Sequence, residues 1–227
     1  MQIFLDTASV DEIKKALQFG VISGVTTNPT LMCKEAGCDF KETILQIAKM
    51  VPGPVSAEVT ALDAPGMIKQ ALEIVNWSDD PEFKDRITIK VPMMTEGTKV
   101  IKELSGQNIA TNCTLIFSVT QALLACEAGA TFISPFVGRI DDAGWDGSLV
   151  LKDIVEMVRA NGYPVQIIAA SIRHPTHVLN AAMLGCDIAT IPLKVLEQLY
   201  KNPLTEIGIK KFNEDWKKFE SSRESKV

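Results

Sequence analysis

The sequence has 227 residues, of which 46% are hydrophobic, so it can fill a sizeable core in one large domain or two small ones. The formal net charge is −5 and the lysines and arginines are scattered, which argues against a nucleic-acid-binding protein. The N-terminus reaches Asp6 with no basic leader before an apolar segment, so it does not resemble a signal peptide and we expect a cytoplasmic protein.

Eight short apolar runs alternate with amphipathic stretches along the chain, and no linker marks a domain boundary. The runs predict strands at residues 2–6, 23–28, 54–59, 86–91, 108–114, 131–136, 164–171 and 187–192. Helical patterns lie between them, and two of these end at Gly20 and Gly162, as helix C-caps often do. Nearly continuous apolar strands separated by helices indicate a parallel sheet that is covered on both faces.

Eight strand–helix units in a chain of this length predict an α/β protein with a closed (β/α)₈ TIM barrel over residues 1–227 as a single domain. A doubly wound open sheet is the alternative, and the absence of GxGxxG in the first turn disfavours it. An additional C-terminal helix is expected at residues 203–219. Its apolar residues Ile207, Phe212, Trp216 and Phe219 predict that it covers another surface.

Two features bear on membranes and on redox state. The uncharged stretch from Leu104 to Cys126 contains too many Asn, Thr, Ser and Gln residues for a membrane span, so we expect a buried strand and a helix there. The five cysteines form no CxxC pair and are odd in number, which indicates reduced, mostly buried thiols. They are Cys33, Cys38, Cys113, Cys126 and Cys186.

Polar residues gather where the predicted strands end, which is where barrel enzymes place their active sites. In the run Arg86–Pro92, the alternation of a strand puts Lys90 on the face opposite Ile87, Ile89 and Val91, so Lys90 can point into the barrel. There it would meet the carboxylates of Asp6 and Glu58. The polar set is Asp6, Thr26, Asn28, Glu58, Lys90, Asn112, Thr114, Ser134, Arg139 and Ser171.

A lysine held in this way suits attack on a carbonyl to form a Schiff base, with two carboxylates for the acid and base steps. The alternative is an ion pair that only holds strands together. Asp6 could also cap the next helix, although Ser9 is the more natural cap and would leave Asp6 for the site.

Two further motifs follow the sixth and seventh strands. Arg139, Ser171 and Arg173 could hold a phosphate group, and solvated surface arginines are the alternative. His174 and His177 are three residues apart but have no third ligand nearby in the sequence, so a capping or surface role is favoured over a metal site. The motifs GxSxG, HExxH and GxxxxGK[ST] do not occur.

The chain resembles the small transaldolase family, which includes the fructose-6-phosphate aldolases. The motifs that carry the resemblance are LDTAS, GVTTNPTL, AEV, TIKVPMMTEG, TNCTLIFS, ISPFVGR and AASIR, in this order along nearly the whole chain. The resemblance implies a (β/α)₈ barrel, a class I Schiff-base mechanism with no cofactor and no metal, and sugar phosphates as substrates. It also implies homo-oligomers, pentamers or decamers, in which the C-terminal helix reaches a neighbouring subunit.

The resemblance assigns roles residue by residue. Lys90 matches the Schiff-base lysine, Asp6 the group that takes the substrate hydroxyl proton, and Glu58 with Thr114 the pair that handles a catalytic water. The matching substrate-binding residues are Asn28, Asn112 and Ser134 for the dihydroxyacetone unit, with Thr26 beside them, Phe136, and Arg139, Ser171 and Arg173 for the phosphate.

Two activities occur within this family. Fructose-6-phosphate aldolases carry Gln in place of Glu58 and Tyr in place of Phe136, and tend to have a smaller apolar residue in place of Ser134. We therefore predict a transaldolase of the non-oxidative pentose phosphate pathway, which converts sedoheptulose 7-phosphate and glyceraldehyde 3-phosphate to erythrose 4-phosphate and fructose 6-phosphate. The alternatives are an aldolase that releases free dihydroxyacetone, a catalytically silent barrel that binds sugar phosphates, and a metal-dependent aldolase.

Overall fold

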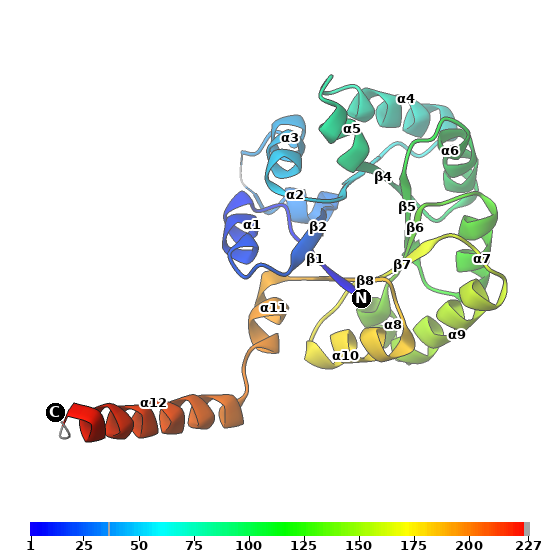
Figure 1. Cartoon of the computed structure of the whole chain (residues 1–227). Coiled ribbons are helices and arrows are strands. Elements are labelled where there is room, and N and C mark those ends of the chain that lie inside the picture. The colour runs from blue at the N-terminus through cyan, green and yellow to red at the C-terminus, as the bar shows by residue number, and fades with distance from the viewer. Residues whose placement is uncertain (36, 225–227) are drawn as a thin grey trace.

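The chain forms a closed barrel of eight parallel strands in a computed structural model that describes residues 1–35 and 37–224 (Figure 1). The strands follow one another around the barrel in chain order, and the last pairs with the first, so the predicted (β/α)₈ fold is confirmed. They are β1 (Gln2–Asp6), β2 (Ile22–Thr26), β3 (Val55–Glu58), β4 (Ile87–Pro92), β5 (Thr111–Ile116), β6 (Phe132–Pro135), β7 (Gln166–Ala169) and β8 (Ile188–Ile191).

Helices surround the barrel, and the chain makes at least one helical segment after every strand (Figure 1). They are α1 (Val10–Leu17), α2 (Pro29–Met32), α3 (Phe40–Met50), α4 (Ala64–Val75), α5 (Pro81–Arg86), α6 (Thr95–Gly106), α7 (Val119–Glu127), α8 (Val137–Asp142), α9 (Gly147–Ala160), α10 (Pro175–Leu184), α11 (Leu193–Leu199) and α12 (Pro203–Glu224). Gly20 and Gly162 follow α1 and α9 with φ of 71° and 65°, a left-handed conformation that ends helices.

Two local predictions were wrong in detail. The fifth strand begins at Thr111 rather than at residue 108, because Asn108 has a φ of 58° and the N–H of Ile109 still bonds to the carbonyl of Leu104. Ser9 precedes α1, but its side chain makes no capping hydrogen bond. The hydroxyl of Thr7 accepts a bond from the Ser9 N–H instead, over 3.1 Å.

The interior of the barrel has an apolar floor. Four buried side chains from β1, β6, β7 and β8 form a separate cluster there, namely Phe4, Phe132, Ile168 and Ile188. Gly24 on β2 leaves room for this cluster, since a Cβ at that residue would lie 2.7 Å from the ring of Phe4. Because side chains alternate along a strand, the residues two positions further on form the next layer. On β1, β6 and β8 these are polar, namely Asp6, Ser134 and Thr190, whereas the corresponding residue after β7 is Ala170.

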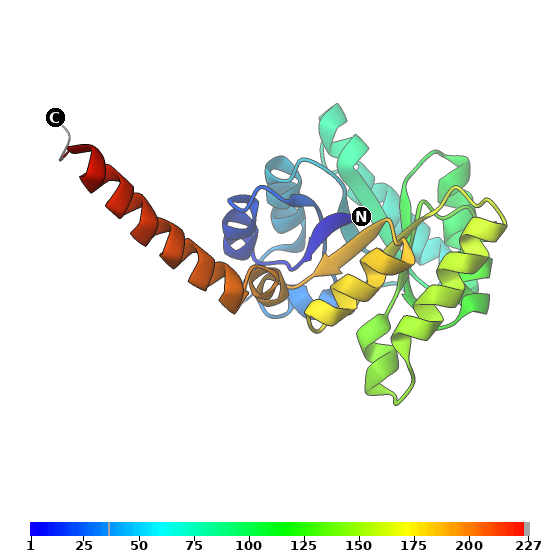
Figure 2. The ribbon, with the colours of Figure 1, turned by 60° about the horizontal axis from the view of Figure 1, so that its bottom comes forward.

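The last helix, α12, extends away from the barrel (Figure 2). It continues to Glu224, beyond the predicted end at residue 219. Its large apolar side chains are exposed in the single chain, among them Leu204, Ile207, Phe212, Trp216 and Phe219. What this helix packs against in solution stays a prediction.

Three thiols are buried, those of Cys113, Cys126 and Cys186, whereas Cys33 and Cys38 are exposed. Burial raises the pKa of Cys113 and of Cys186 to about 12, so these two remain protonated thiols. Within residues 1–35 and 37–224, no helix has the length and apolar composition that crossing a bilayer requires.

Candidate active site

A cavity of about 350 Å³ opens at the C-terminal ends of the strands. Nine of the twelve residues proposed from the sequence line it, and they come from five strand ends and the loops that follow. These nine are Asp6, Thr26, Asn28, Lys90, Ser134, Phe136, Arg139, Ser171 and Arg173. The other three, Glu58, Asn112 and Thr114, lie on β3 and β5, the strands on either side of the strand that carries Lys90.

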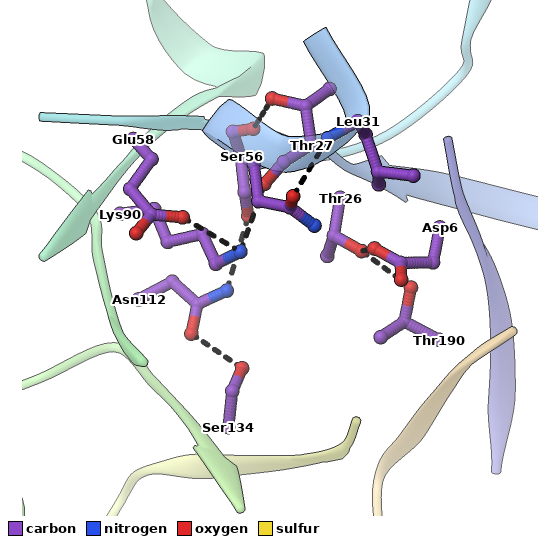
Figure 3. A network of polar contacts seen from close by, with 11 residues as sticks. Asp6, Thr26, Thr27, Leu31, Ser56, Glu58, Lys90, Asn112, Ser134 and Thr190 are labelled. Atoms are coloured by element: carbon purple, nitrogen blue, oxygen red, sulfur yellow. Dashed lines mark hydrogen bonds and ion pairs between the residues drawn. The ribbon is translucent and has the colours of Figure 1, made fainter. Parts of the chain in front are cut away.

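Lys90 points into the barrel, as the strand alternation predicts. Its neighbours Ile89 and Val91 point the other way, into the apolar core between the strands and the surrounding helices. Its side chain is only 3% exposed. The Nζ atom lies 3.0 Å from Glu58 Oε2 and donates to the carbonyl oxygen of Thr27 over 2.9 Å (Figure 3). Strand register explains the first contact, because Glu58 and Lys90 are directly paired across β3 and β4.

Asp6 lies across the barrel from Glu58, beside β2 and β8 (Figure 3). The hydroxyl of Thr26 donates to Asp6 Oδ1 over 2.8 Å and lies 2.6 Å from the hydroxyl of Thr190. Since Thr26 has a single hydroxyl proton and Asp6 accepts it, Thr190 is the donor in the second bond. The chain of hydroxyls fixes the Asp6 carboxyl in place.

The pKa of Asp6 is raised above its ordinary value. Its side chain opens onto the cavity, but the surrounding protein still removes enough water from the carboxylate for desolvation to be the largest effect. The Lys90 ammonium and the Thr26 bond lower this pKa, without cancelling the effect of burial. A carboxyl with a raised pKa is better able to exchange a proton near neutral pH.

Asn112 and Ser134 form a buried polar chain on the wall next to Lys90. Ser134 Oγ donates to Asn112 Oδ1 over 2.7 Å, and Asn112 Nδ2 donates to Ser56 Oγ over 3.2 Å (Figure 3). These bonds fix which way the amide faces, and they hold the Ser134 hydroxyl at the cavity wall. On the opposite wall, Asn28 Oδ1 caps α2 by accepting from the Leu31 N–H, which leaves the amide Nδ2 as the group that Asn28 can offer to a ligand.

Glu58 and Thr114 have a different environment from the rest of the set. Thr114 is buried, and its hydroxyl has no hydrogen-bond partner among the residues described. A buried hydroxyl normally bonds to protein or to water, so this one is suited to hold a water molecule. Glu58 bonds to Lys90 and also lines a second, mostly apolar cavity of about 370 Å³, together with Phe40 and Trp77.

The three residues proposed to hold a phosphate lie on one side of the cavity. Arg139, on α8, stacks its guanidinium 4.9 Å from the centre of the Phe136 ring. Ser171 and Arg173 are in the loop before α10, and Arg173 Nη2 forms an ion pair of 2.8 Å with Asp142. Gly138 allows the close approach of α8 to this loop, since a Cβ there would lie 2.1 Å from the carbonyl oxygen of Ser171.

The sequence analysis missed several residues at or near the site. Thr190 and Lys34 line the cavity, and Ser56 supports Asn112. The capping or surface role favoured for the histidines was wrong for His177, which is 5% exposed within α10, whereas His174 is exposed at the N-cap of α10. The sequence held a signal only for Ser56, which lies two residues before Glu58 on β3 and therefore shares its inward direction.

Comparisons with known proteins show the family of the chain and agree with its fold. A family model described as Transaldolase/Fructose-6-phosphate aldolase matches residues 3–223. A probable transaldolase of Roseiflexus castenholzii is 51% identical over 223 residues, which cover 98% of this chain and 100% of that protein. A probable transaldolase of Moorella thermoacetica is 53% identical over 218 residues, covering 96% of this chain and 98% of that protein.

Among solved structures, a chain of a cube-shaped, highly porous protein cage designed by fusing symmetric oligomeric domains superposes with a TM-score of 0.58. The match covers 98% of this chain and 78% of that chain at 13% sequence identity, so it shows the fold alone. The family model and the two relatives cover nearly the whole chain and agree with each other. The chain therefore belongs to the transaldolase/fructose-6-phosphate aldolase family.

Proposed function

We propose that this enzyme is a transaldolase that moves a dihydroxyacetone unit from a ketose phosphate to an aldose phosphate in the non-oxidative pentose phosphate pathway. The relatives that are 51–53% identical over nearly their full length are named probable transaldolases. The observation that carries the mechanism is the buried Lys90, which faces the cavity with its Nζ 3.0 Å from Glu58. The cytoplasmic location expected from the sequence is part of this proposal.

The first step is formation of a Schiff base. Lys90, in its neutral form, attacks the C2 carbonyl of the ketose phosphate, and loss of water from the adduct leaves an imine. Glu58 is within hydrogen-bond distance of Nζ, so it can accept the proton that the ammonium must lose and return it to the departing hydroxyl. The Thr114 hydroxyl is proposed to hold the water that is released here and consumed again when the imine is hydrolysed.

The second step breaks the bond between C3 and C4. Asp6 takes the proton of the C4 hydroxyl, the C3–C4 electrons move into the protonated imine, and an aldose phosphate leaves. The three-carbon unit remains on Lys90 as an enamine, held by Asn28, Asn112 and Ser134. Attack of the enamine carbon on the carbonyl of a second aldose phosphate, with the proton returned from Asp6, forms the imine of the new ketose phosphate, and hydrolysis of this imine releases the sugar and the free amine of Lys90.

The phosphate group of either sugar is proposed to lie against Arg139, Ser171 and Arg173. The two guanidinium groups carry positive charge on the same side of the cavity, and their forked donors suit the oxygens of a phosphate. A metal-dependent aldolase is the less favoured candidate, because Lys90 already supplies the group that accepts the electrons of the breaking bond. Turnover that is unchanged in excess chelator would agree with this assignment.

Phe136 is expected to favour transfer over release of dihydroxyacetone. Its ring is buried at the cavity wall, against Phe117 and the Arg139 guanidinium, and offers no hydrogen-bond donor to a water molecule. We expect fructose 6-phosphate and erythrose 4-phosphate together to give sedoheptulose 7-phosphate and glyceraldehyde 3-phosphate. With fructose 6-phosphate alone, free dihydroxyacetone should form slowly, and Phe136→Tyr should raise that rate by at least about tenfold, the value of one hydrogen bond to a charged intermediate.

The control for this substitution is Phe117→Tyr, which adds a hydroxyl to the aromatic neighbour of Phe136, a ring that is partly exposed. It should leave the ratio of transfer to release as in the parent. Rapid release of dihydroxyacetone by the parent enzyme, with or without an aldose acceptor, would show that the aldolase activity is the correct one.

The exposed apolar face of α12 is proposed to pack on a neighbouring subunit in a pentamer or decamer. Phe212 and Trp216 are 73% and 59% exposed, which is more apolar surface than an isolated tail retains. We expect light scattering at micromolar concentration to give five or ten times the mass of one chain, and Phe212→Glu with Trp216→Glu to lower that mass. A monomeric mass for the parent protein would contradict the proposal.

A further inference from the structure

The loop that carries Ser171 and Arg173 has a strained backbone that the rest of the structure must hold in place. Ser171 has a φ of 58°, a left-handed conformation that is uncommon for residues other than glycine. The loop lies between β7 and α10 and contacts α8 on its other side, where the N–H of Gly138 donates to the carbonyl oxygen of Ser171 over 3.1 Å. Contacts that fix this backbone therefore also fix the groups proposed to bind phosphate.

His177, in the first turn of α10, makes one of these contacts. The backbone N–H of Arg173 donates to His177 Nδ1 over 3.3 Å. The other ring nitrogen, Nε2, lies 2.8 Å from Asp141 Oδ2 on α8. A second oxygen of the same carboxylate, Oδ1, accepts from the N–H of Gly147 over 2.8 Å, so Asp141 is itself held in place.

The contacts of His177 determine its tautomer. Since Nδ1 accepts a hydrogen bond, it carries no proton, and the neutral ring must bear its proton on Nε2, which faces the Asp141 carboxylate. The pKa of His177 is lowered from its ordinary value, chiefly by burial and then by the nearby His174, which keeps the ring neutral and Nδ1 available as an acceptor. Asp141 thus orients the ring, and the ring orients the Arg173 backbone.

We infer that His177 is a positioning residue for phosphorylated substrates, which fixes the loop of Ser171 and Arg173 through the hydrogen bond from the Arg173 N–H to Nδ1. This inference rests on the proposed function, because it takes Arg139, Ser171 and Arg173 as the phosphate site. The same helix, α8, carries Arg139 and Asp141, so the link through His177 joins the two halves of that site. His177 itself does not line the cavity that contains Lys90.

The test compares KM for fructose 6-phosphate with KM for unphosphorylated fructose, in a transfer assay with unphosphorylated erythrose as the fixed acceptor. We expect His177→Ala to raise KM for fructose 6-phosphate about fivefold, the value of one neutral hydrogen bond, with kcat changed less than about twofold. The kinetic constants for fructose should not change, because fructose has no phosphate to place. The matched control is Thr176→Ala, which alters the exposed residue next to His177 on α10 and should leave both KM values as in the parent.

Two isosteric variants keep the test valid if the alanine variant folds poorly. An asparagine side chain can present an oxygen near the place of Nδ1, whereas a glutamine side chain reaches the place of Nε2 and gives Arg173 no acceptor. We expect His177→Asn to have a KM for fructose 6-phosphate closer to the parent, and His177→Gln to resemble His177→Ala. The opposite order, or equal effects on fructose and fructose 6-phosphate, would overturn the inference.

A parallel measurement on Arg139→Ala separates this inference from the proposed function. If Arg139→Ala raises KM for fructose 6-phosphate alone while His177→Ala leaves it unchanged, the phosphate site stands and the inference fails. If Arg139→Ala affects both sugars equally or neither, the phosphate site itself is wrong, and the inference fails with it. Support for the inference requires that both variants raise KM for the phosphorylated sugar alone.

Discussion

Replacing Lys90 by methionine should lower kcat for transfer by roughly 10⁴-fold or more, because the variant has no amine to form the Schiff base. Methionine keeps most of the length of the side chain, so the shape of the buried wall is largely conserved. The measurement is the initial rate of sedoheptulose 7-phosphate formation from fructose 6-phosphate and erythrose 4-phosphate.

This substitution also leaves Glu58 without its partner. Glu58 is 13% exposed, so it retains some access to solvent, and we expect a loss of about 1–3 kcal/mol in the free energy of unfolding. A second variant, Lys90→Met with Glu58→Gln, should recover much of this stability while remaining inactive. That result would separate loss of the nucleophile from damage to the fold, whereas parent-like turnover by either variant would contradict the mechanism.

Replacing Asp6 by asparagine should lower kcat by roughly 10²–10⁴-fold, since the C4 hydroxyl then has no base to take its proton. Asparagine still accepts the Thr26 hydrogen bond, so the geometry of the site should be kept. Because Asp6 acts after imine formation, the variant should still form the Schiff base on Lys90. If the variant loses both Schiff-base formation and turnover, Asp6 acts earlier than proposed.

The same variant should be more stable than the parent at neutral pH. The pKa of Asp6 is raised in the folded protein, so the unfolded chain releases this proton at a lower pH than the folded chain does. The free energy of unfolding of the parent therefore falls as pH rises from about 4 through the folded pKa, and Asp6→Asn removes this loss. Urea unfolding at several pH values measures the difference in free energy of unfolding between the variant and the parent, which should grow with pH. A parent protein that is more stable than the variant at neutral pH would contradict this prediction.

The strand alternation around Lys90 was enough to predict which way its side chain points. Side chains alternate between the two faces of a strand, so Lys90 faces the barrel interior when the apolar residues next to it face the helices. Glu58 and Asp6 lie at the same end of the barrel as Lys90 because all the strands are parallel. The resemblance to the family added the roles of Thr114 and Asn112, whose residue types alone carry little chemical signal. These predictions depend on local periodicity and on a fold with a known site.

The residues that were missed depend on contacts between distant segments. Thr190 and Ser56 are ordinary strand residues, and only the strand order brings them to Thr26 and Asn112. Whether His177 faces the core depends on how α8 packs on α10, and the pairing of Arg173 with Asp142 depends on the same contact. Sequence periodicity contains no information on these distances.

The most direct test of the account is to trap the intermediate with borohydride in the presence of fructose 6-phosphate and to map the modified peptide by mass spectrometry. Borohydride reduces the imine to a stable amine, so the mass shift marks the lysine that formed the Schiff base. Of the lysines in residues 1–35 and 37–224, two line the cavity, the buried Lys90 and the exposed Lys34, and Lys34→Met should leave the labelling unchanged. We predict a single adduct on Lys90; an adduct on Lys34, or none in an enzyme that still turns over, would contradict the mechanism.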